Sequence, residues 1–133
     1  MIFVDTSALI AILAAEPDAA MFAAKIQADG DRITGAHVIL EAAMTLSTVA
    51  GLAPTTADAE VMRALHEASI AVVPVDEEVA HAAVAAFERY GKGRRHRASL
   101  NFGDCLSYAC AKAHGAKLLF KGGDFAHTDI ARA

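Results

Sequence analysis

Short apolar runs alternate with longer segments of helical pattern along the chain. The first run, Ile2–Val4, ends at Asp5, and apolar residues at helical spacing follow from Thr6 to Ala14. An apolar run, an acid, a capping hydroxyl and a helix are the signals by which a parallel strand passes into a crossover helix. We therefore expect a strand at the start of the chain, with Thr6 or Ser7 capping the next helix.

The rest of the chain repeats this alternation. Three later runs predict strands at Arg32–Thr34, Ile70–Val73 and Lys117–Phe120. The first predicted helix of this part begins at Glu16-Pro17-Asp18, and the next covers Ala36–Ala50 with Gly51 as its C-terminal cap. Pro54-Thr55-Thr56 begins the following helix, roughly Thr56–Glu67, and the last two are Asp76–Arg89 and Gly103–His114. No hairpin signal joins two strands, so the connections are crossovers and the sheet is mostly parallel. The pattern predicts the α/β class.

Composition adds limits to this picture. The length of 133 residues predicts one domain spanning 1–133, and 55% hydrophobic residues with 21% charged residues are typical of a folded chain. No apolar stretch reaches the roughly 18 residues that span a bilayer, and Asp5 stands where a signal peptide carries basic residues. We therefore expect a cytoplasmic protein. Cys105 and Cys110 lack the spacing of a redox or zinc motif, so we expect two reduced structural thiols.

Charge is sorted along the chain. The formal net charge of −4 argues weakly against a nucleic-acid partner. However, a cluster with no acid among its members holds 5 of the 12 basic residues. These residues are Arg89, Lys92, Arg94, Arg95 and Arg97. Such sorting indicates a binding surface, although a solvated loop would show the same composition.

Four acids are predicted to lie near the carboxyl ends of the strands. Asp5 follows the first strand, and Asp124 lies just after the fourth. Asp104 begins the helix that precedes the fourth strand, and Glu41 lies one to two turns into the helix after the second. Ligands of open parallel sheets bind beyond the carboxyl ends of the strands. We therefore expect these four carboxylates to converge at one edge of the sheet.

Each acid also has an ordinary structural explanation. Asp5 could cap a helix, Asp104 suits a helix dipole and Asp124 suits a turn. Glu41 could be a surface residue, although it is the only acid in a long apolar segment. Their joint placement favours a function. Clustered like charges need neutralisation, and oxygen ligands without a His–Cys set favour Mg²⁺ or Mn²⁺ over zinc. The six histidines share no metal-ligand spacing.

Four segments carry a resemblance to a known family. Met1–Leu9, with Val4-Asp5-Thr6-Ser7, resembles the opening of PIN-domain proteins of the VapC toxin group. Leu100–Ala109 resembles their third acidic motif, and Lys117–Phe125 with Thr128-Asp129-Ile130 resembles their closing motif. Glu41 among apolar neighbours is similar to their second. The resemblance spans essentially the whole chain.

This resemblance implies a fold, an activity and a site. The fold would be the three-layer α/β/α PIN-like fold, with a short, mostly parallel central sheet of four to five strands. The activity would be that of a Mg²⁺- or Mn²⁺-dependent endoribonuclease, the toxin of a toxin–antitoxin pair, using a metal-activated water. Asp5, Glu41, Asp104 and Asp124 would be catalytic and would hold the metal. Asp5 and Asp104 would be direct ligands, while Glu41 and Asp124 would act partly through water.

The resemblance also implies supporting residues and partners. Thr6, Ser7 and Asn101 would orient the ligands or the substrate. A cognate VapB-type antitoxin would inhibit the enzyme by occupying the acidic pocket, and the chain would form a homodimer and a toxin–antitoxin hetero-oligomer. Lys92, Arg94, Arg95 and Arg97 would bind either RNA phosphates or the antitoxin. The serious alternative is a non-catalytic PIN-like module that binds RNA or a partner.

Overall fold

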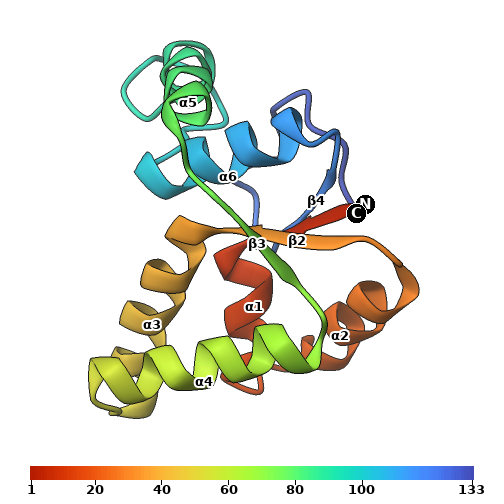
Figure 1. Cartoon of the computed structure of the whole chain (residues 1–133). Helices are drawn as coiled ribbons and strands as arrows, with labels where there is room; N and C mark the ends of the chain where they lie inside the picture. The colour runs from red at the N-terminus through yellow and green to blue at the C-terminus, as the bar shows by residue number, and fades with distance from the viewer.

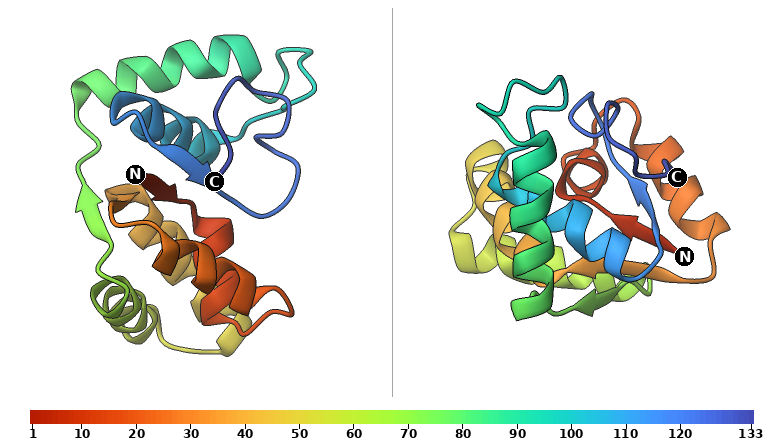
Figure 2. Two further views of the ribbon diagram at one scale, coloured as in Figure 1. Left: turned by 90° about the vertical axis from the view of Figure 1, so that its right-hand side faces the viewer. Right: turned by 90° about the horizontal axis from the view of Figure 1, so that it is seen from above.

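A computed structural model describes all residues, 1–133, as a central sheet between two layers of helices (Figures 1 and 2). The four strands are β1 (Ile2–Val4), β2 (Arg32–Gly35), β3 (Ala71–Val73) and β4 (Lys117–Leu119). The six helices are α1 (Thr6–Leu13), α2 (Ala19–Ala28), α3 (Ala36–Ala50), α4 (Pro54–Glu67), α5 (Glu77–Tyr90) and α6 (Phe102–Ala113). The predicted α/β class and the three-layer arrangement are confirmed.

The sheet has the order β3-β2-β1-β4, and all its pairings are parallel. The chain builds outward from β1 through β2 to the edge strand β3, then returns to place β4 on the other side of β1. Strand order therefore reverses between β1 and β4. At such a point the carboxyl ends of the strands open into a crevice, which is the usual ligand position in open α/β sheets.

The two faces of the sheet are covered differently. Helix α6 lies on one face with α5 packed outside it, whereas α1 and α3 cover the other face with α2 and α4 beyond them (Figure 1). The core is continuous across the sheet and includes Phe3, Leu9, Leu65, Leu118 and Phe120. Because a core of this kind resists small shifts, it fixes the directions in which the helix ends point.

Local signals explain most helix boundaries, and one prediction needs correction. Gly51 adopts the left-handed conformation, with φ of 65°, and ends α3 as predicted. Helix α4 begins at Pro54, the first residue of the predicted start, because proline suits the first helical turn, where its missing N–H has no helical partner. Helix α1 is capped by Asp5, not by Thr6 or Ser7, since the Asp5 carboxylate accepts a hydrogen bond from the Ser7 backbone N–H.

Two other features of the fold bear on earlier predictions. Cys105 and Cys110 are free and buried. For the expected homodimer, Ala42, Ala43 and Ala57 offer no surface because they are buried in the core, while Leu40 and Met44 are exposed. No single helix has the length and hydropathy needed to cross a membrane. The pair α3 and α4 meets both criteria only when counted together, and a bend of 117° separates the two helices.

Candidate active site

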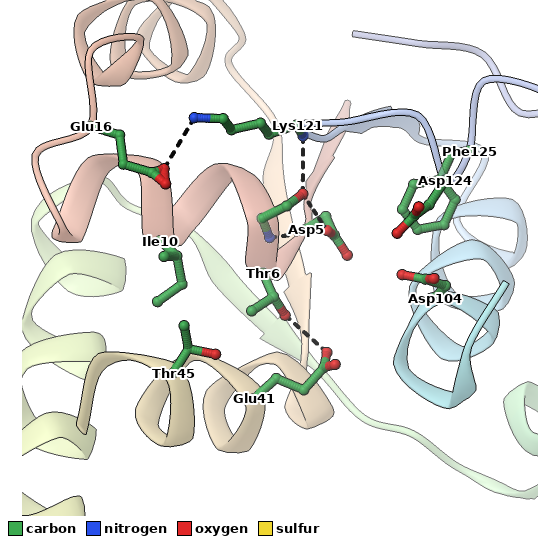
Figure 3. A pocket seen from close by; sticks show the side chains of 11 residues that line it. Asp5, Thr6, Ile10, Glu16, Glu41, Thr45, Asp104, Lys121, Asp124 and Phe125 are labelled. Atoms are coloured by element: carbon green, nitrogen blue, oxygen red, sulfur yellow. Dashed lines mark hydrogen bonds and ion pairs between the residues drawn. The ribbon is translucent and has the colours of Figure 1, made fainter. Parts of the chain in front are cut away.

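A cavity of about 270 Å³ lies at the carboxyl edge of the sheet, where β1 and β4 end. All four acids predicted from the sequence line it, and they come from four separate segments of the chain (Figure 3). Asp104 and Asp124 face each other, with Asp5 directed toward them (Figure 3). The complete lining is Asp5, Thr6, Ser7, Ile10, Glu16, Glu41, Thr45, Asp104, Lys121, Asp124 and Phe125.

Asp5 is the most buried of the four acids, with 5% of its surface exposed. One oxygen, Oδ2, accepts hydrogen bonds from the Ser7 backbone N–H at 3.0 Å and from the Ser7 hydroxyl at 2.6 Å. The same hydroxyl oxygen accepts a hydrogen bond from the Lys121 backbone N–H at 3.0 Å. Ser7 thus joins the end of β1 to the segment after β4 and fixes the orientation of the Asp5 carboxylate.

Glu41 reaches the cavity from the second turn of α3. Its Oε1 accepts a hydrogen bond from the Thr6 hydroxyl at 2.9 Å. Burial raises the pKa of the Glu41 carboxyl, and the charge of Asp5 acts in the same direction, against the hydrogen bond from Thr6. The predicted supporting residues Thr6 and Ser7 therefore each hold one of the acids.

Asp104 lies in the first turn of α6 and forms a capping box with Asn101. The Asn101 backbone N–H donates to Asp104 Oδ2 at 3.0 Å, and the Asn101 side chain accepts from the Asp104 backbone N–H at 2.9 Å. Burial raises the pKa of Asp104 to about 7. The charges of Asp124, Asp5 and Glu41 act in the same direction. Asn101 does not line the cavity, so its contribution is to position Asp104.

Asp124 is exposed on the loop after β4, and its neighbour Phe125 anchors that loop. Phe125 is buried and packs edge-to-face against Phe120, with ring centroids 5.1 Å apart. The anchor keeps Asp124 opposite Asp104 although the loop has no regular structure.

A divalent cation fits the chemistry of this donor set. The cavity holds the four predicted carboxylates beside a fifth acid, Glu16. The pKa values of Glu41 and Asp104 are raised, first because burial disfavours the charged form and then because of the neighbouring carboxylates. No group of three or more carboxylate, histidine or cysteine side chains is arranged to enclose one ion by itself. Carboxylate oxygens are nevertheless the donors that suit Mg²⁺, which keeps several of its waters and is usually bound through one or two carboxylates. Zinc, which prefers nitrogen and sulfur donors, fits poorly.

Comparison with known proteins identifies the family. The chain matches the PIN domain over residues 2–131. It is 48% identical over 128 residues to "VapC ribonuclease Mb0640" of Mycobacterium bovis, covering 96% of this chain and 95% of that protein. The "Ribonuclease VapC" of Mycolicibacterium smegmatis is 47% identical over 96% of both chains. The chain belongs to the PIN-domain family, in its VapC group. The resemblance predicted from the sequence is thereby confirmed.

Solved structures support the fold of this VapC-family chain. The crystal structure of VapC20 of Mycobacterium tuberculosis, described as a sarcin-ricin loop cleaving toxin, aligns with a TM-score of 0.78 at 19% identity. That alignment covers 100% of this chain and 98% of the other. A toxin–antitoxin complex from Klebsiella pneumoniae aligns with a TM-score of 0.69 at 17% identity, covering 97% and 93%.

Three residues that bear on the acids were not predicted as part of the site: Glu16, Lys121 and Gly103. Lys121 is the one cation in the cavity lining, and its ammonium group lies 3.1 Å from Glu16, a fifth acid of the lining, and 3.0 Å from Asp18. Gly103 lies against the Glu41 carboxylate. The position of Lys121 just after the fourth predicted strand was a signal for that residue, whereas nothing local marked Glu16 or Gly103.

The basic loop lies outside the cavity. Lys92, Arg94, Arg95 and Arg97 are exposed, and none of them lines the acidic pocket. Arg89 is instead 3.6 Å from Asp129 and belongs to an ion-pair network of the C-terminal segment. Any contact of this loop with RNA or an antitoxin therefore lies outside the acidic pocket.

Proposed function

We propose that this chain is an endoribonuclease and the toxin of a toxin–antitoxin pair, and that it cuts RNA at the acidic cavity with a bound Mg²⁺ or Mn²⁺. One observation carries the proposal: four carboxylates from separate segments converge at the carboxyl edge of the sheet, in a chain whose curated VapC relatives are named ribonucleases. A surface used only for binding does not require this concentration of partly buried negative charge, which is unfavourable without a cation.

The roles of the acids follow from their surroundings. A divalent cation supplies activation of a water molecule and neutralisation of charge on the phosphodiester. Asp5 and Asp104 are the direct donors, because each is held in place by hydrogen bonds from its own helix start. Glu41 and Asp124 complete the site through water molecules.

The raised pKa of Asp104 has a consequence for catalysis. At a pKa of about 7 in the metal-free protein, the carboxyl is partly protonated at neutral pH. Asp104 would hold a cation only in its ionised form, so occupancy of the site would be coupled to loss of the Asp104 proton. Activity should rise with pH through this range as the ionised form becomes available.

The proposal extends to partners. A cognate antitoxin would inhibit the enzyme, and the chain would form a homodimer. Large apolar side chains left exposed support such contacts: Leu40 and Met44 on α3, and Phe87 and Phe102 on α5 and α6. Lys92, Arg94, Arg95 and Arg97 supply an adjacent positive surface for RNA phosphates or for an acidic segment of the antitoxin.

The direct experiment is cleavage of total RNA by the purified chain, freed of antitoxin, with Mg²⁺ or Mn²⁺ and with EDTA. We expect discrete fragments that require the metal and that are absent with the Asp5→Asn variant. The ends of the fragments would identify the RNA and the cleaved sequence. If the folded protein cut no RNA under any metal, and if Asp5→Asn left its toxicity in cells unchanged, the chain would be a binding module.

A further inference from the structure

Helices α3 and α6 meet at the carboxyl edge of the sheet, and there Glu41 of α3 lies against Gly103 of α6. A Cβ atom added to Gly103 would overlap Glu41 Oε2, and it would lie 2.6 Å from Glu41 Cδ and 2.8 Å from Oε1. Real Cβ atoms do not approach other atoms so closely. The Glu41 carboxylate therefore occupies the space that any side chain at position 103 would take.

The backbone of α6 gives no other reason for glycine at this position. Gly103 does not have the positive φ that marks Gly51, Gly93, Gly115 and Gly122. It stands in the first turn of a helix, where alanine is more favourable than glycine. What glycine provides here is room for the close approach of another group.

A second contact keeps the two helices from moving apart. One turn along each helix, His37 Nε2 lies 2.9 Å from the hydroxyl oxygen of Ser107, which is fully buried. Helix α6 is also packed against β1, β2 and β4. A Cβ at position 103 would therefore displace the flexible end of Glu41 more easily than it would displace α6.

The geometry points to Gly103 as a positioning residue for the metal site: its missing side chain allows the Glu41 carboxylate to lie beside Asp104. This inference rests on the proposed function, because it assumes that Glu41 contributes to binding the cation. Thr6 holds Oε1 from α1, and Gly103 leaves the space in which Oε2 lies. Helices α1 and α6 together thus fix the direction of the Glu41 carboxylate.

The test is Gly103→Ala, measured by Mn²⁺ titration calorimetry, RNA cleavage and thermal unfolding of the metal-free protein. We expect Mn²⁺ affinity and cleavage to fall by about tenfold or more, as for other residues that orient ligands. The matched control is Gly30→Ala, at an exposed position where an added Cβ meets no atom. Gly30→Ala should change neither affinity nor cleavage. Unaltered affinity and cleavage in folded Gly103→Ala would overturn the inference.

A double-mutant cycle with Glu41→Ala separates positioning from a general disturbance of α6. In the Glu41→Ala background, Gly103→Ala should change Mn²⁺ affinity by less than about twofold, because the group that it displaces is gone. An equal loss of affinity in both backgrounds would contradict the inference. If Gly103→Ala alone fails to fold, the double variant should fold; if that variant also fails, the inference is wrong.

Thermal unfolding without metal distinguishes this inference from the proposed function. Gly103→Ala should raise Tm in the Glu41→Ala background, where helix propensity acts alone, and should raise it less, or lower it, when Glu41 is present. A chain that binds no Mn²⁺ and cuts no RNA but shows this difference would contradict the proposed function alone. Identical changes in Tm in both backgrounds would contradict the positioning role of Gly103.

Discussion

Three helices of this protein begin with an acid whose side chain accepts a capping hydrogen bond, and only two of those acids belong to the site. Asp5 caps α1 and Asp104 completes the cap of α6, and both line the cavity. Asp76 caps α5 in the same way, accepting a hydrogen bond from the Val79 backbone N–H at 2.9 Å. Yet Asp76 is exposed and lines none of the described cavities. Local chemistry at the three helix starts is therefore alike.

The difference lies in the position of each helix start relative to the sheet. Helices α1 and α6 begin beside the point between β1 and β4 where strand order reverses, whereas α5 begins after the edge strand β3. Only the point between β1 and β4 brings acids from several segments together and reduces their contact with water. A capping acid becomes part of a metal site through convergence and burial, not through its own helix.

The largest effect on RNA cleavage is expected from Asp5→Asn, with Asp76→Asn as the matched control. Asparagine caps a helix about as well as aspartate, so both variants should keep their fold. Asp5→Asn should lower RNA cleavage by more than about a hundredfold, because loss of a ligand exceeds the loss caused by residues that merely orient ligands. Asp76→Asn should leave cleavage unchanged. Cleavage rates with Mn²⁺ check both, and equal losses would contradict the distinction.

A smaller effect is expected from Thr6→Val, which keeps the shape of the side chain but removes the donor to Glu41 Oε1. Cleavage should fall by about tenfold, since the Glu41 carboxylate loses its orientation. The control is Thr48→Val on α3, where an exposed hydroxyl donates only to the Met44 carbonyl. Steady-state cleavage assays and thermal unfolding check both. Full activity of Thr6→Val would show that this hydrogen bond is dispensable.

The raised pKa of Asp104 predicts a pH dependence of stability in the metal-free protein. Its pKa is about 7 when folded and lower when unfolded, so the folded state binds more protons between pH of about 4 and 7. Stability should therefore fall as pH rises through this window, by roughly 1–2 kcal/mol after allowance for partial exposure. Denaturant unfolding of Asp104→Asn should lack this component and show a more stable protein at pH of about 8. The same slope in both proteins would contradict the assignment.

The smallest structural effect is expected at the basic loop. Replacing Arg94, Arg95 and Arg97 by alanine should change stability by less than about 0.5 kcal/mol for each residue, because the side chains are exposed. Mn²⁺ affinity should be unchanged. The slope of RNA affinity against salt should fall by about one for each lost phosphate contact. An unchanged slope with weakened antitoxin binding would assign the loop to the antitoxin instead.

Local signals in the sequence were enough for most of the fold. The left-handed Gly51 ended α3 where predicted, and the apolar runs located the four strands within about one residue, because caps and periodicity act over a few neighbouring positions. Where two local signals competed, the prediction was wrong: Asp5 rather than Thr6 or Ser7 capped α1.

The acids of the site could also be predicted, since the strand ends of a parallel sheet share one edge. Gly103 and the direction of the Lys121 side chain could not. Each depends on a partner far away in the sequence: Glu41 for Gly103, and Glu16 and Asp18 for Lys121. No pattern within one element records how closely a second element will approach it.

We expect Asp5, Glu41, Asp104 and Asp124 to bind a metal ion together, as one site. Calorimetric titration of the metal-free protein with Mn²⁺ tests it most directly, using Asp5→Asn, Glu41→Gln, Asp104→Asn and Asp124→Asn. We predict that each substitution weakens the same binding event, most strongly at Asp5 and Asp104, while Asp76→Asn binds like the wild type. Binding that persists unchanged in all four variants would show that the cavity is not the metal site.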